Sequence, residues 1–292
     1  MGRTVYVNGE FLDESEARIS IFDRGFLFAD GVYEVSSILR GGLVDNDAHL
    51  RRLERSLSEL SMPAPASGAE INAIQKELVS RNRVEEGALY LQVTRGAADR
   101  EFSYPRDTKP SLVMFTQARS LVDSPAAARG ISVVTLPDIR WKRRDIKTIG
   151  LLPASMAKEA AMAQGADDAW MVEDDCITEG SSNNAYIVSP DGEILTRHLG
   201  SEILAGITRA AILRLSRETG IPVIERPFTV EEARHANEAF ATSATTFVYP
   251  VVRIDGRSIG DGTPGPVTKR LRALYIEMAL EQVGSAGSGS NP

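Results

Sequence analysis

The stretch Gln117-Ala118-Arg119-Ser120-Leu121-Val122-Asp123-Ser124-Pro125-Ala126-Ala127-Ala128-Arg129-Gly130 divides the chain into two parts. It contains turn-forming residues and four alanines but no apolar periodicity, which is typical of a linker between domains. On both sides, strand patterns alternate with helix patterns. We therefore predict a mixed α and β fold with two domains: an N-terminal α+β domain at 1–118, a linker at 119–130, a C-terminal α/β domain at 131–283 and a flexible Gly/Ser tail at 284–292.

The N-terminal side of this stretch carries both kinds of pattern. The strand patterns are rich in β-branched and aromatic residues, and the helix patterns repeat apolar residues every three or four positions. The predicted strands are Thr4–Val7, Gly31–Leu39, Ala88–Thr94 and Ser111–Thr116, and the predicted helices are His49–Leu60 and Glu70–Val79.

The C-terminal side shows the same alternation with shorter strands. The predicted strands are Ile131–Leu136, Ala169–Val172, Ala185–Val188, Val223–Glu225 and Glu238–Ala241, and the predicted helices are Ala154–Ala163, Ile207–Glu218 and Val267–Glu281. Mixed patterns of this kind on both sides favour two α and β domains over an all-α or all-β protein.

Composition narrows the range of partners. The chain has 33 Lys and Arg against 40 Asp and Glu, a formal net charge of −7, which argues against a nucleic-acid-binding protein. The single cysteine excludes an intrachain disulfide, and the three histidines match no metal-ligand spacing, so we expect no metal site. The sequence shows no signal peptide and no apolar run long enough to cross a membrane, so we expect a cytoplasmic protein that does not bind membranes.

One of the six lysines differs from the others in its surroundings. Five of them lie among charged or polar residues, whereas Lys147 follows Ile146 and precedes Thr148-Ile149-Gly150-Leu151-Leu152. A lysine in an apolar segment either extends its amine to solvent from the edge of a strand or serves as a nucleophile whose reactivity burial increases. The segment alone leaves both interpretations open.

Three polar segments are candidates for ligand binding, the first for a polar ligand and the other two for a phosphate. Thr178–Asn184 lies between two predicted strands and contains Glu179 as its only charge. Leu204–Arg209 leads into a helix, whose N-terminal N–H groups can bind phosphate. Thr242–Thr246 is a second hydroxyl-rich connection between strands. Each segment also has an ordinary explanation, as a polar turn or a helix cap.

Further candidates lie near the N-terminus. Tyr33 and Val35 share one face of a predicted strand, and Arg52 lies on the helix that follows. A half-buried aromatic residue and a solvated arginine are the simpler explanations for Tyr33 and Arg52.

Taken together and in this order, these segments resemble the class IV (fold type IV) pyridoxal-phosphate-dependent aminotransferases, most closely the D-amino-acid aminotransferases. The resemblance extends from Thr4 to about Leu280 and implies a D-amino-acid aminotransferase-like fold, a homodimer and pyridoxal 5′-phosphate as cofactor. Its most specific segments are Asp23-Arg24-Gly25 with Asp30-Gly31-Val32-Tyr33-Glu34-Val35, Asp138-Ile139-Arg140-Trp141 with Asp145-Ile146-Lys147, Thr178-Glu179-Gly180-Ser181-Ser182-Asn183-Asn184, and Gly206-Ile207-Thr208-Arg209.

The resemblance implies a role for each matching residue. Lys147 is similar to the lysine that forms a Schiff base with the cofactor and then moves the substrate proton. Glu179 is similar to the carboxylate that keeps the pyridine nitrogen protonated, so that the ring can take up electrons. The other cofactor-binding matches are Arg52 for a bidentate phosphate contact, Ile207, Thr208, Ser243 and Ala244 for further phosphate contacts, Leu204 against the ring, and Asn184 at the end of the Glu-Gly-Ser segment.

Substrate binding follows from the same resemblance. It implies that Tyr33, beside Val35, binds the substrate carboxylate together with Arg100 from a loop of the partner subunit. Phe102 stands where the family has a histidine, so one carboxylate donor is missing. Ala244 stands where threonine is usual, and Thr245 is the neighbouring hydroxyl that could replace it.

We therefore predict a transaminase that moves an amino group from a D-amino acid, such as D-alanine or D-glutamate, to a 2-oxo acid. The missing histidine leaves an (R)-selective amine transaminase as an alternative. A branched-chain aminotransferase and an aminodeoxychorismate lyase, which would use the same lysine, are also open. A non-catalytic protein that binds a phosphorylated metabolite would need neither Lys147 nor Glu179.

Overall fold

The structure is a computed structural model that describes residues 2–287, and in it the chain forms two compact units. Unit 1 comprises residues 2–120, 146–150 and 279–287, and unit 2 comprises residues 121–145 and 151–278. The chain therefore passes from one unit to the other four times. Among the described residues, no helix is both long and apolar enough to span a membrane.

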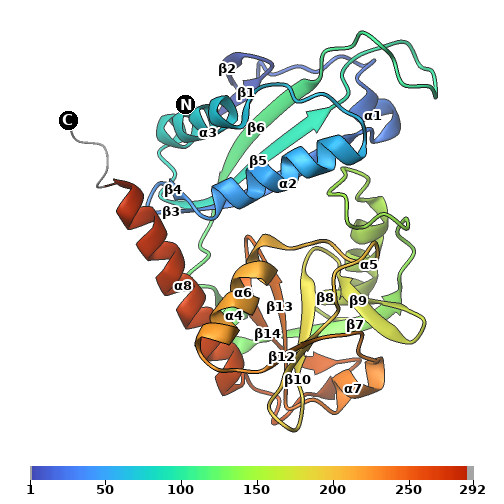
Figure 1. Ribbon diagram of the computed structural model, residues 1–292, viewed down its shortest axis with the longest axis vertical. Helices are drawn as coiled ribbons and strands as arrows, with labels where there is room; N and C mark the ends of the chain where they lie inside the picture. The colour runs from blue at the N-terminus through green and yellow to red at the C-terminus, as the bar shows by residue number, and fades with distance from the viewer. Residues whose placement is uncertain (1, 288–292) are drawn as a thin grey trace. The chain divides into compact units, whose positions relative to one another are not determined.

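Unit 1 contains a six-stranded antiparallel sheet. Its strands are β1 (Thr4–Val7), β2 (Glu10–Asp13), β3 (Gly31–Leu39), β4 (Gly42–Leu43), β5 (Glu86–Thr94) and β6 (Ser111–Ala118), in the order β2-β1-β6-β5-β3-β4. The helices α2 (Asn46–Glu59) and α3 (Gly68–Asn82) cover one face of this sheet, and the short helix α1 (Arg24–Phe28) precedes β3 (Figure 1).

The two faces of β3 have different surroundings, as the alternation of a strand requires. Val32 and Ile38 lie in the apolar core, which also contains Leu53 and Leu57 of α2. Tyr33 and Val35 are only half-buried. The predicted placement of these two residues on one face of a strand is thus confirmed, and it is the face that α2 and α3 leave uncovered.

Unit 2 contains a larger mixed sheet of nine strands. They are β7 (Ile131–Pro137), β8 (Asp168–Glu173), β9 (Cys176–Gly180), β10 (Asn184–Val188), β11 (Ile194–Thr196), β12 (Val223–Glu225), β13 (Glu238–Ser243), β14 (Phe247–Ile254) and β15 (Arg257–Ser258). The order is β12-β11-β10-β13-β14-β7-β8-β9, with β15 paired to β14. The pairs β11/β12, β14/β7 and β7/β8 are parallel and the remaining pairs are antiparallel.

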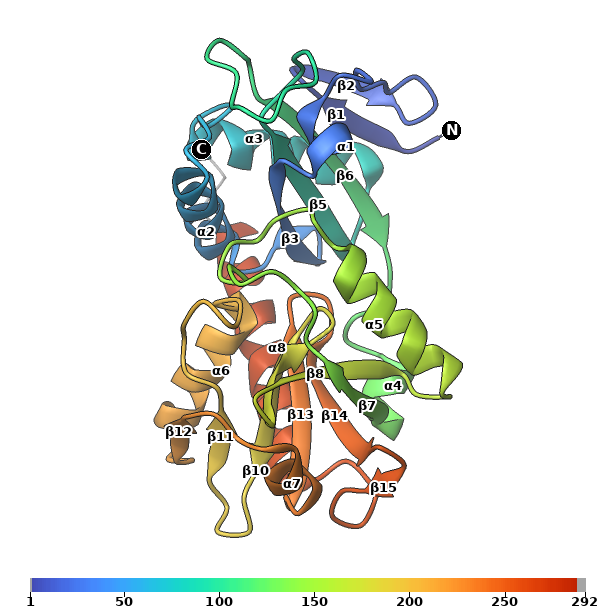
Figure 2. The ribbon, with the colours of Figure 1, turned by 90° about the vertical axis from the view of Figure 1, so that its right-hand side faces the viewer.

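Helices pack on this sheet from more than one direction. The helix α5 (Leu152–Ala163) packs through Ala157 and Ala161 against Val134 of β7 and Met171 of β8 (Figure 2). The other helices are α4 (Pro125–Arg129), α6 (Ile207–Glu218), α7 (Val230–Arg234) and α8 (Pro266–Gly287). Of these, α6 follows β11 in the chain and contacts β13, which places its first turn near the ends of the central strands.

The predicted elements all overlap observed ones, but the predicted linker at 119–130 differs from the structure. Residues 121–130 belong to unit 2 and contain α4, whose N-cap Ser124 accepts a hydrogen bond from the Ala127 N–H and lies 2.6 Å from the Tyr249 hydroxyl. A helix of five residues is too short to show apolar periodicity, so its pattern is that of a loop.

The predicted flexible tail at 284–292 also differs from the structure. Helix α8 continues through Gly284 and Ser285 to Gly287, and the Ser285 hydroxyl donates to the Gln282 carbonyl at 3.0 Å. Extending an existing helix adds one hydrogen bond per residue, which offsets the poor helix propensity of Gly and Ser. The last part of the predicted tail, 288–292, lies outside the described residues.

Candidate active site

Lys147 lies in unit 1 and runs alongside strand β3. The Tyr33 N–H donates to the Lys147 carbonyl at 3.0 Å, and the Ile149 N–H donates to the Gly31 carbonyl at 3.1 Å. A Cβ on Gly31 would lie 2.8 Å from Ile149 Cδ1, so glycine permits this close approach. As a result the half-buried Lys147 side chain places its Nζ 4.1 Å from the centre of the Tyr33 ring.

Arg52 is held by a buried carboxylate on the opposite face of β3. Glu34 accepts from Arg52 Nε at 2.8 Å and from Nη2 at 2.7 Å, and its Oε2 also lies 2.7 Å from Nδ1 of His49. Burial alone would raise the pKa of Glu34, but the Arg52 guanidinium and the His49 ring lower it to about 2. The sequence did not indicate that Glu34 and His49 fix the orientation of Arg52.

Glu179 is a buried carboxylate of unit 2. Its Oε1 accepts from Arg140 Nη1 at 2.5 Å, and its Oε2 accepts from Asn184 Nδ2 at 3.0 Å and from the Leu204 N–H at 3.1 Å. Burial raises the pKa of the Glu179 carboxyl, while the Arg140 guanidinium and the Leu204 N–H oppose that rise. The structure thus brings the predicted residues Glu179, Asn184 and Leu204 together.

Arg140 is a residue of this site that our sequence interpretation quoted without a role. Besides Glu179, it binds Asp138 through Nε at 3.0 Å and Nη2 at 2.7 Å. Although burial favours the protonated acid, these contacts hold the pKa of Asp138 below its usual value. Arg140 therefore lies between two carboxylates. In the sequence, its position two residues after Asp138 is a sign that these two side chains can pair.

The first turn of α6 is a possible anion site. Gly206 occupies the N-cap position and Thr208 is buried in the first turn. A Cβ on Gly206 would lie 2.1 Å from Asn184 Oδ1, so this close approach needs glycine. Because glycine has no side chain to cap the helix, the N–H groups at Ile207 and Thr208 are suited to an anionic ligand.

A second polar turn lies beside this helix start. Ser243 and Phe247 form the last pair of the β13–β14 hairpin, and Ala244, Thr245 and Thr246 are its turn residues. The Ser243 hydroxyl lies 2.8 Å from the Thr246 hydroxyl. In the next strand, Asn184 pairs with Thr242 and contacts Leu204, so the turn and the start of α6 lie at the same end of the sheet.

The loop between β5 and β6 in unit 1 carries the remaining predicted residues. The guanidinium carbon of Arg100 lies 5.4 Å from the centre of the Phe28 ring and 5.6 Å from that of Phe102. The two rings meet edge to face at 5.6 Å. Arg24 donates to the Glu101 and Ser103 carbonyls and so anchors the loop on both sides of Phe102.

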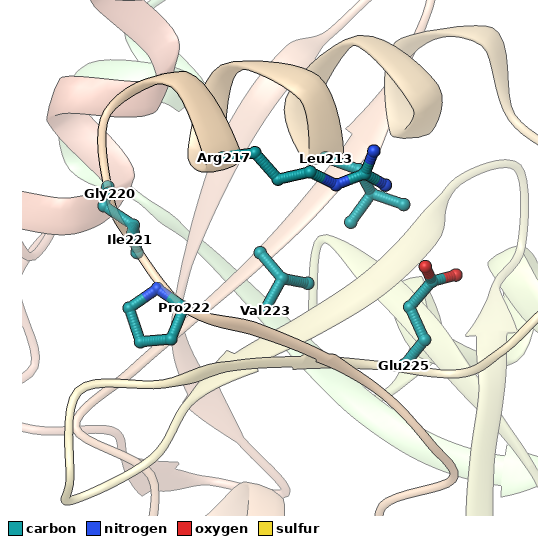
Figure 3. Close-up of a pocket in the computed structure, with 7 residues that line it drawn as sticks. All are labelled: Leu213, Arg217, Gly220, Ile221, Pro222, Val223 and Glu225. Atoms are coloured by element: carbon teal, nitrogen blue, oxygen red, sulfur yellow. The ribbon is translucent and has the colours of Figure 1, made fainter.

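A pocket of about 330 Å³ opens at the other end of α6 (Figure 3). It contains none of the predicted site residues, and its lining residues are Leu213, Arg217, Gly220, Ile221, Pro222, Val223 and Glu225.

The residues of both units suit pyridoxal phosphate by their chemistry. Unit 2 offers a helix start that needs glycine, a hydroxyl-rich turn for a phosphate and a buried carboxylate for a ring nitrogen. Unit 1 offers a half-buried amine beside an aromatic ring and an arginine fixed by a carboxylate. An amine, a buried carboxylate and an anion-binding helix start together are what pyridoxal chemistry requires of a protein.

Comparison with known proteins agrees with this chemistry. The model of the family "Amino-transferase class IV" matches residues 31–254. D-alanine aminotransferases of Bacillus licheniformis and of Staphylococcus aureus (strain MW2) are 40% and 38% identical to the chain, over 95% and 94% of it and 98% of each relative.

Solved structures show the same fold. A branched-chain amino acid aminotransferase of Escherichia coli matches with a TM-score of 0.88 at 21% identity, over 96% of this chain and 95% of that one. A branched-chain amino acid aminotransferase of T.th., solved with pyridoxamine 5′-phosphate, matches with a TM-score of 0.87 at 27% identity, over 95% and 94%. The fold type IV prediction is thereby confirmed, and the chain belongs to the class IV aminotransferases, which depend on pyridoxal 5′-phosphate.

Proposed function

We propose that this aminotransferase moves an amino group from a D-amino acid, such as D-alanine or D-glutamate, to a 2-oxo acid. The observation that carries the proposal is the pairing of the Lys147 segment with β3, which places the lysine amine beside Tyr33. The choice of a D-amino acid as donor rests on the D-alanine aminotransferases, 38% to 40% identical to this chain over most of its length.

The proposed roles follow from the contacts of each residue. When bound, the cofactor supplies a protonated pyridine ring that takes up the electron pair left at the substrate Cα. Lys147 would hold the cofactor through Nζ, and its amine, once free, would carry the substrate proton. Glu179, with Arg140 fixing its Oε1, holds the proton at the ring nitrogen.

The phosphate of the cofactor is assigned to three groups of donors. Ile207 and Thr208 provide the first turn of α6, and Ser243 and Ala244 provide the hairpin turn. Arg52 contributes a guanidinium whose orientation Glu34 fixes. In this proposal Leu204 packs against the ring, and Asn184 joins Glu179 to the start of α6.

Substrate recognition is assigned to Tyr33, Val35 and Arg100. Arg100 lies in a loop that Arg24 anchors, and its guanidinium supports a donor with a carboxylate. Phe102 at the histidine position supports a second candidate, an (R)-selective amine transaminase, because an aromatic ring favours an apolar substituent over a carboxylate.

Exposed apolar side chains of unit 1 support the proposal of a homodimer. Phe26 and Phe102 are 76% and 75% exposed, and Ile21, Phe22 and Tyr104 are also exposed. Apolar groups gathered on adjacent segments in this way mark interaction sites. We also propose that the enzyme is cytoplasmic.

A donor panel tests the function. Purified protein is offered D-amino acids, L-amino acids and (R)-amines with pyruvate or 2-oxoglutarate as acceptor. D-amino acids should react fastest and the protein should show the visible absorbance of an imine, which Lys147→Ala abolishes and Lys76→Ala on the exposed face of α3 retains. Silence with every donor would contradict the proposal and favour a lyase or a binding protein. Turnover by Lys147→Ala would contradict the role given to Lys147.

A further inference from the structure

Arg272 of α8 donates all of its described hydrogen bonds to main-chain carbonyls of unit 2. Its Nη1 donates to the Thr246 carbonyl at 2.8 Å and to the Val248 carbonyl at 3.1 Å. Its Nη2 donates to the carbonyls of Leu121 and Val122 at 2.7 and 3.0 Å. The guanidinium therefore ties the backbone of the β13–β14 turn, through Nη1, to the Leu121–Val122 backbone, through Nη2.

The residue between the first two acceptors has an unusual backbone. Phe247 has a φ of 58°, in the left-handed region, and its side chain is fully buried. A non-glycine residue in this region is strained and persists only where its surroundings fix it. Residues held in this way often lie at ligand-binding sites.

Helix α8 supplies the contacts that fix Phe247. The Phe247 ring lies 5.1 Å from the ring of Tyr275. The Arg272 guanidinium carbon lies 5.8 Å from the centre of the Phe247 ring and 5.7 Å from that of Tyr249. The backbone on both sides of Phe247 and the ring itself are therefore held by residues one turn apart on a single helix.

The turn that these contacts hold has no hydroxyl at Ala244. Ala244 has only its backbone N–H to offer an anion, so the binding strength of the turn depends on how well its N–H groups are directed. A donor directed before the ligand arrives binds more tightly, because less ordering is needed on binding.

We propose that Arg272 is a positioning residue for the cofactor phosphate: by fixing the Thr246–Val248 backbone, it directs the N–H groups of the turn at the phosphate. The inference rests on the proposed function and deepens it at the phosphate site. Arg272 itself does not touch the cofactor.

The test separates phosphate binding from general stability. Apoenzyme of the wild type, Arg272→Lys and Arg272→Gln is titrated with pyridoxal 5′-phosphate and with pyridoxal, which lacks the phosphate. Arg270→Lys, an exposed arginine on the same helix, is the matched control. Circular dichroism and thermal unfolding verify that each variant is folded.

We expect the Arg272 variants to bind pyridoxal 5′-phosphate about tenfold more weakly, the factor for ~1.4 kcal/mol, and pyridoxal as the wild type does. Inorganic phosphate should compete less well with the cofactor in these variants, and Arg270→Lys should match the wild type. Equal weakening for both ligands, unchanged affinities, or loss of folding in both variants would overturn the inference. Wild-type protein that binds no pyridoxal 5′-phosphate would instead overturn the proposed function.

Discussion

Arg140 Nη1 lies 2.5 Å from Glu179 Oε1, and the same guanidinium binds both oxygens of Asp138. Arg140 and Glu179 are 39 positions apart in the chain. Arg140 lies on the segment after β7, and Glu179 lies on β9. The cation opposes the effect of burial on Glu179, because it favours the ionised carboxylate. Arg140 therefore helps to keep Glu179 in the state that a protonated pyridine needs.

Replacing Arg140 should shift the pH dependence of the reaction. In Arg140→Gln the pKa of Glu179 should rise, because a positive neighbour is lost, so the acid limb of the kcat/KM profile should move to higher pH. The pH–rate profile measures this shift, and Arg143→Lys, at an exposed arginine that pairs with Asp145, is the control. An acid limb at the wild-type pH would contradict the role given to Arg140.

Replacing Glu179 should lower the rate of the reaction without weakening cofactor binding. Glu179→Gln keeps the shape and the contact with Asn184 but removes the charge, so the ring nitrogen loses its partner while the phosphate donors remain. We expect kcat to fall roughly 100-fold, as when a preorganised charge interaction is removed, with little change in cofactor affinity. Stopped-flow absorbance and cofactor titration measure the two quantities, and an unchanged rate would exclude the role.

Glu34 should link the stability of the protein to acid pH. Its pKa is about 2 in the folded chain against the ordinary 4.5, so the unfolded chain binds this proton more tightly. Ionised Glu34 therefore contributes on the order of 3 kcal/mol to the free energy of unfolding above pH ~5, and this contribution disappears as the pH falls toward ~2.

Urea unfolding of the wild type and Glu34→Gln at several pH values measures this effect. The difference in unfolding free energy between the wild type and Glu34→Gln should shrink as the pH falls. The control is Glu77→Gln, at an exposed pair with Arg81, and its difference from the wild type should stay small at every pH. If the unfolding free energies of the wild type and Glu34→Gln differ by the same amount at pH ~5 and at pH ~2, the link is ruled out.

Arg100 should distinguish amino acids from amines. Arg100→Ala removes a charged donor to the substrate carboxylate, so kcat/KM for D-alanine should fall about 10- to 100-fold, the effect of losing a hydrogen bond to a charged group. The rate with (R)-1-phenylethylamine should change little, because that donor has no carboxylate. Phe102→His should raise the preference for D-alanine, and equal losses for both donors in Arg100→Ala would argue against carboxylate binding.

Gly206 should be required for cofactor binding. Its replacement by alanine would place a Cβ 2.1 Å from Asn184 Oδ1, so Asn184 or the start of α6 must move. We expect the affinity for pyridoxal 5′-phosphate to fall about tenfold, since the N–H groups of the helix start lose their direction. Gly68→Ala, where a Cβ meets nothing within 4 Å, is the matched control, and equal affinities in the two variants would contradict the prediction.

The sequence predicted the local structure around several candidate residues correctly. The alternation of β3 correctly placed Tyr33 and Val35 on one face, because period two follows from strand geometry alone. The start of α6 was predicted because apolar spacing and a preceding glycine lie next to each other in the chain. These features depend on neighbouring residues only.

The features that were missed depend on distant residues. Strand β14 contains Pro250, which a sequence pattern assigns to loops or edges, yet it pairs with β13 on one side and β7 on the other. The left-handed Phe247 needs α8 to hold it, and the partner of Glu179 had to come from the segment around Arg140. No local pattern contains such pairings.

The repeated crossing of the chain between its units also affects how the protein can be made. Strand β3 is synthesised early, but the Lys147 segment that pairs with it emerges only after β7, and Ile146 of that segment belongs to the core of unit 1. During synthesis on the ribosome, unit 1 therefore stays incomplete until part of unit 2 has been translated. A fragment that ends at residue 118 would lack both Lys147 and the buried core residue Ile146, so the N-terminal part of the chain is not a complete unit by itself.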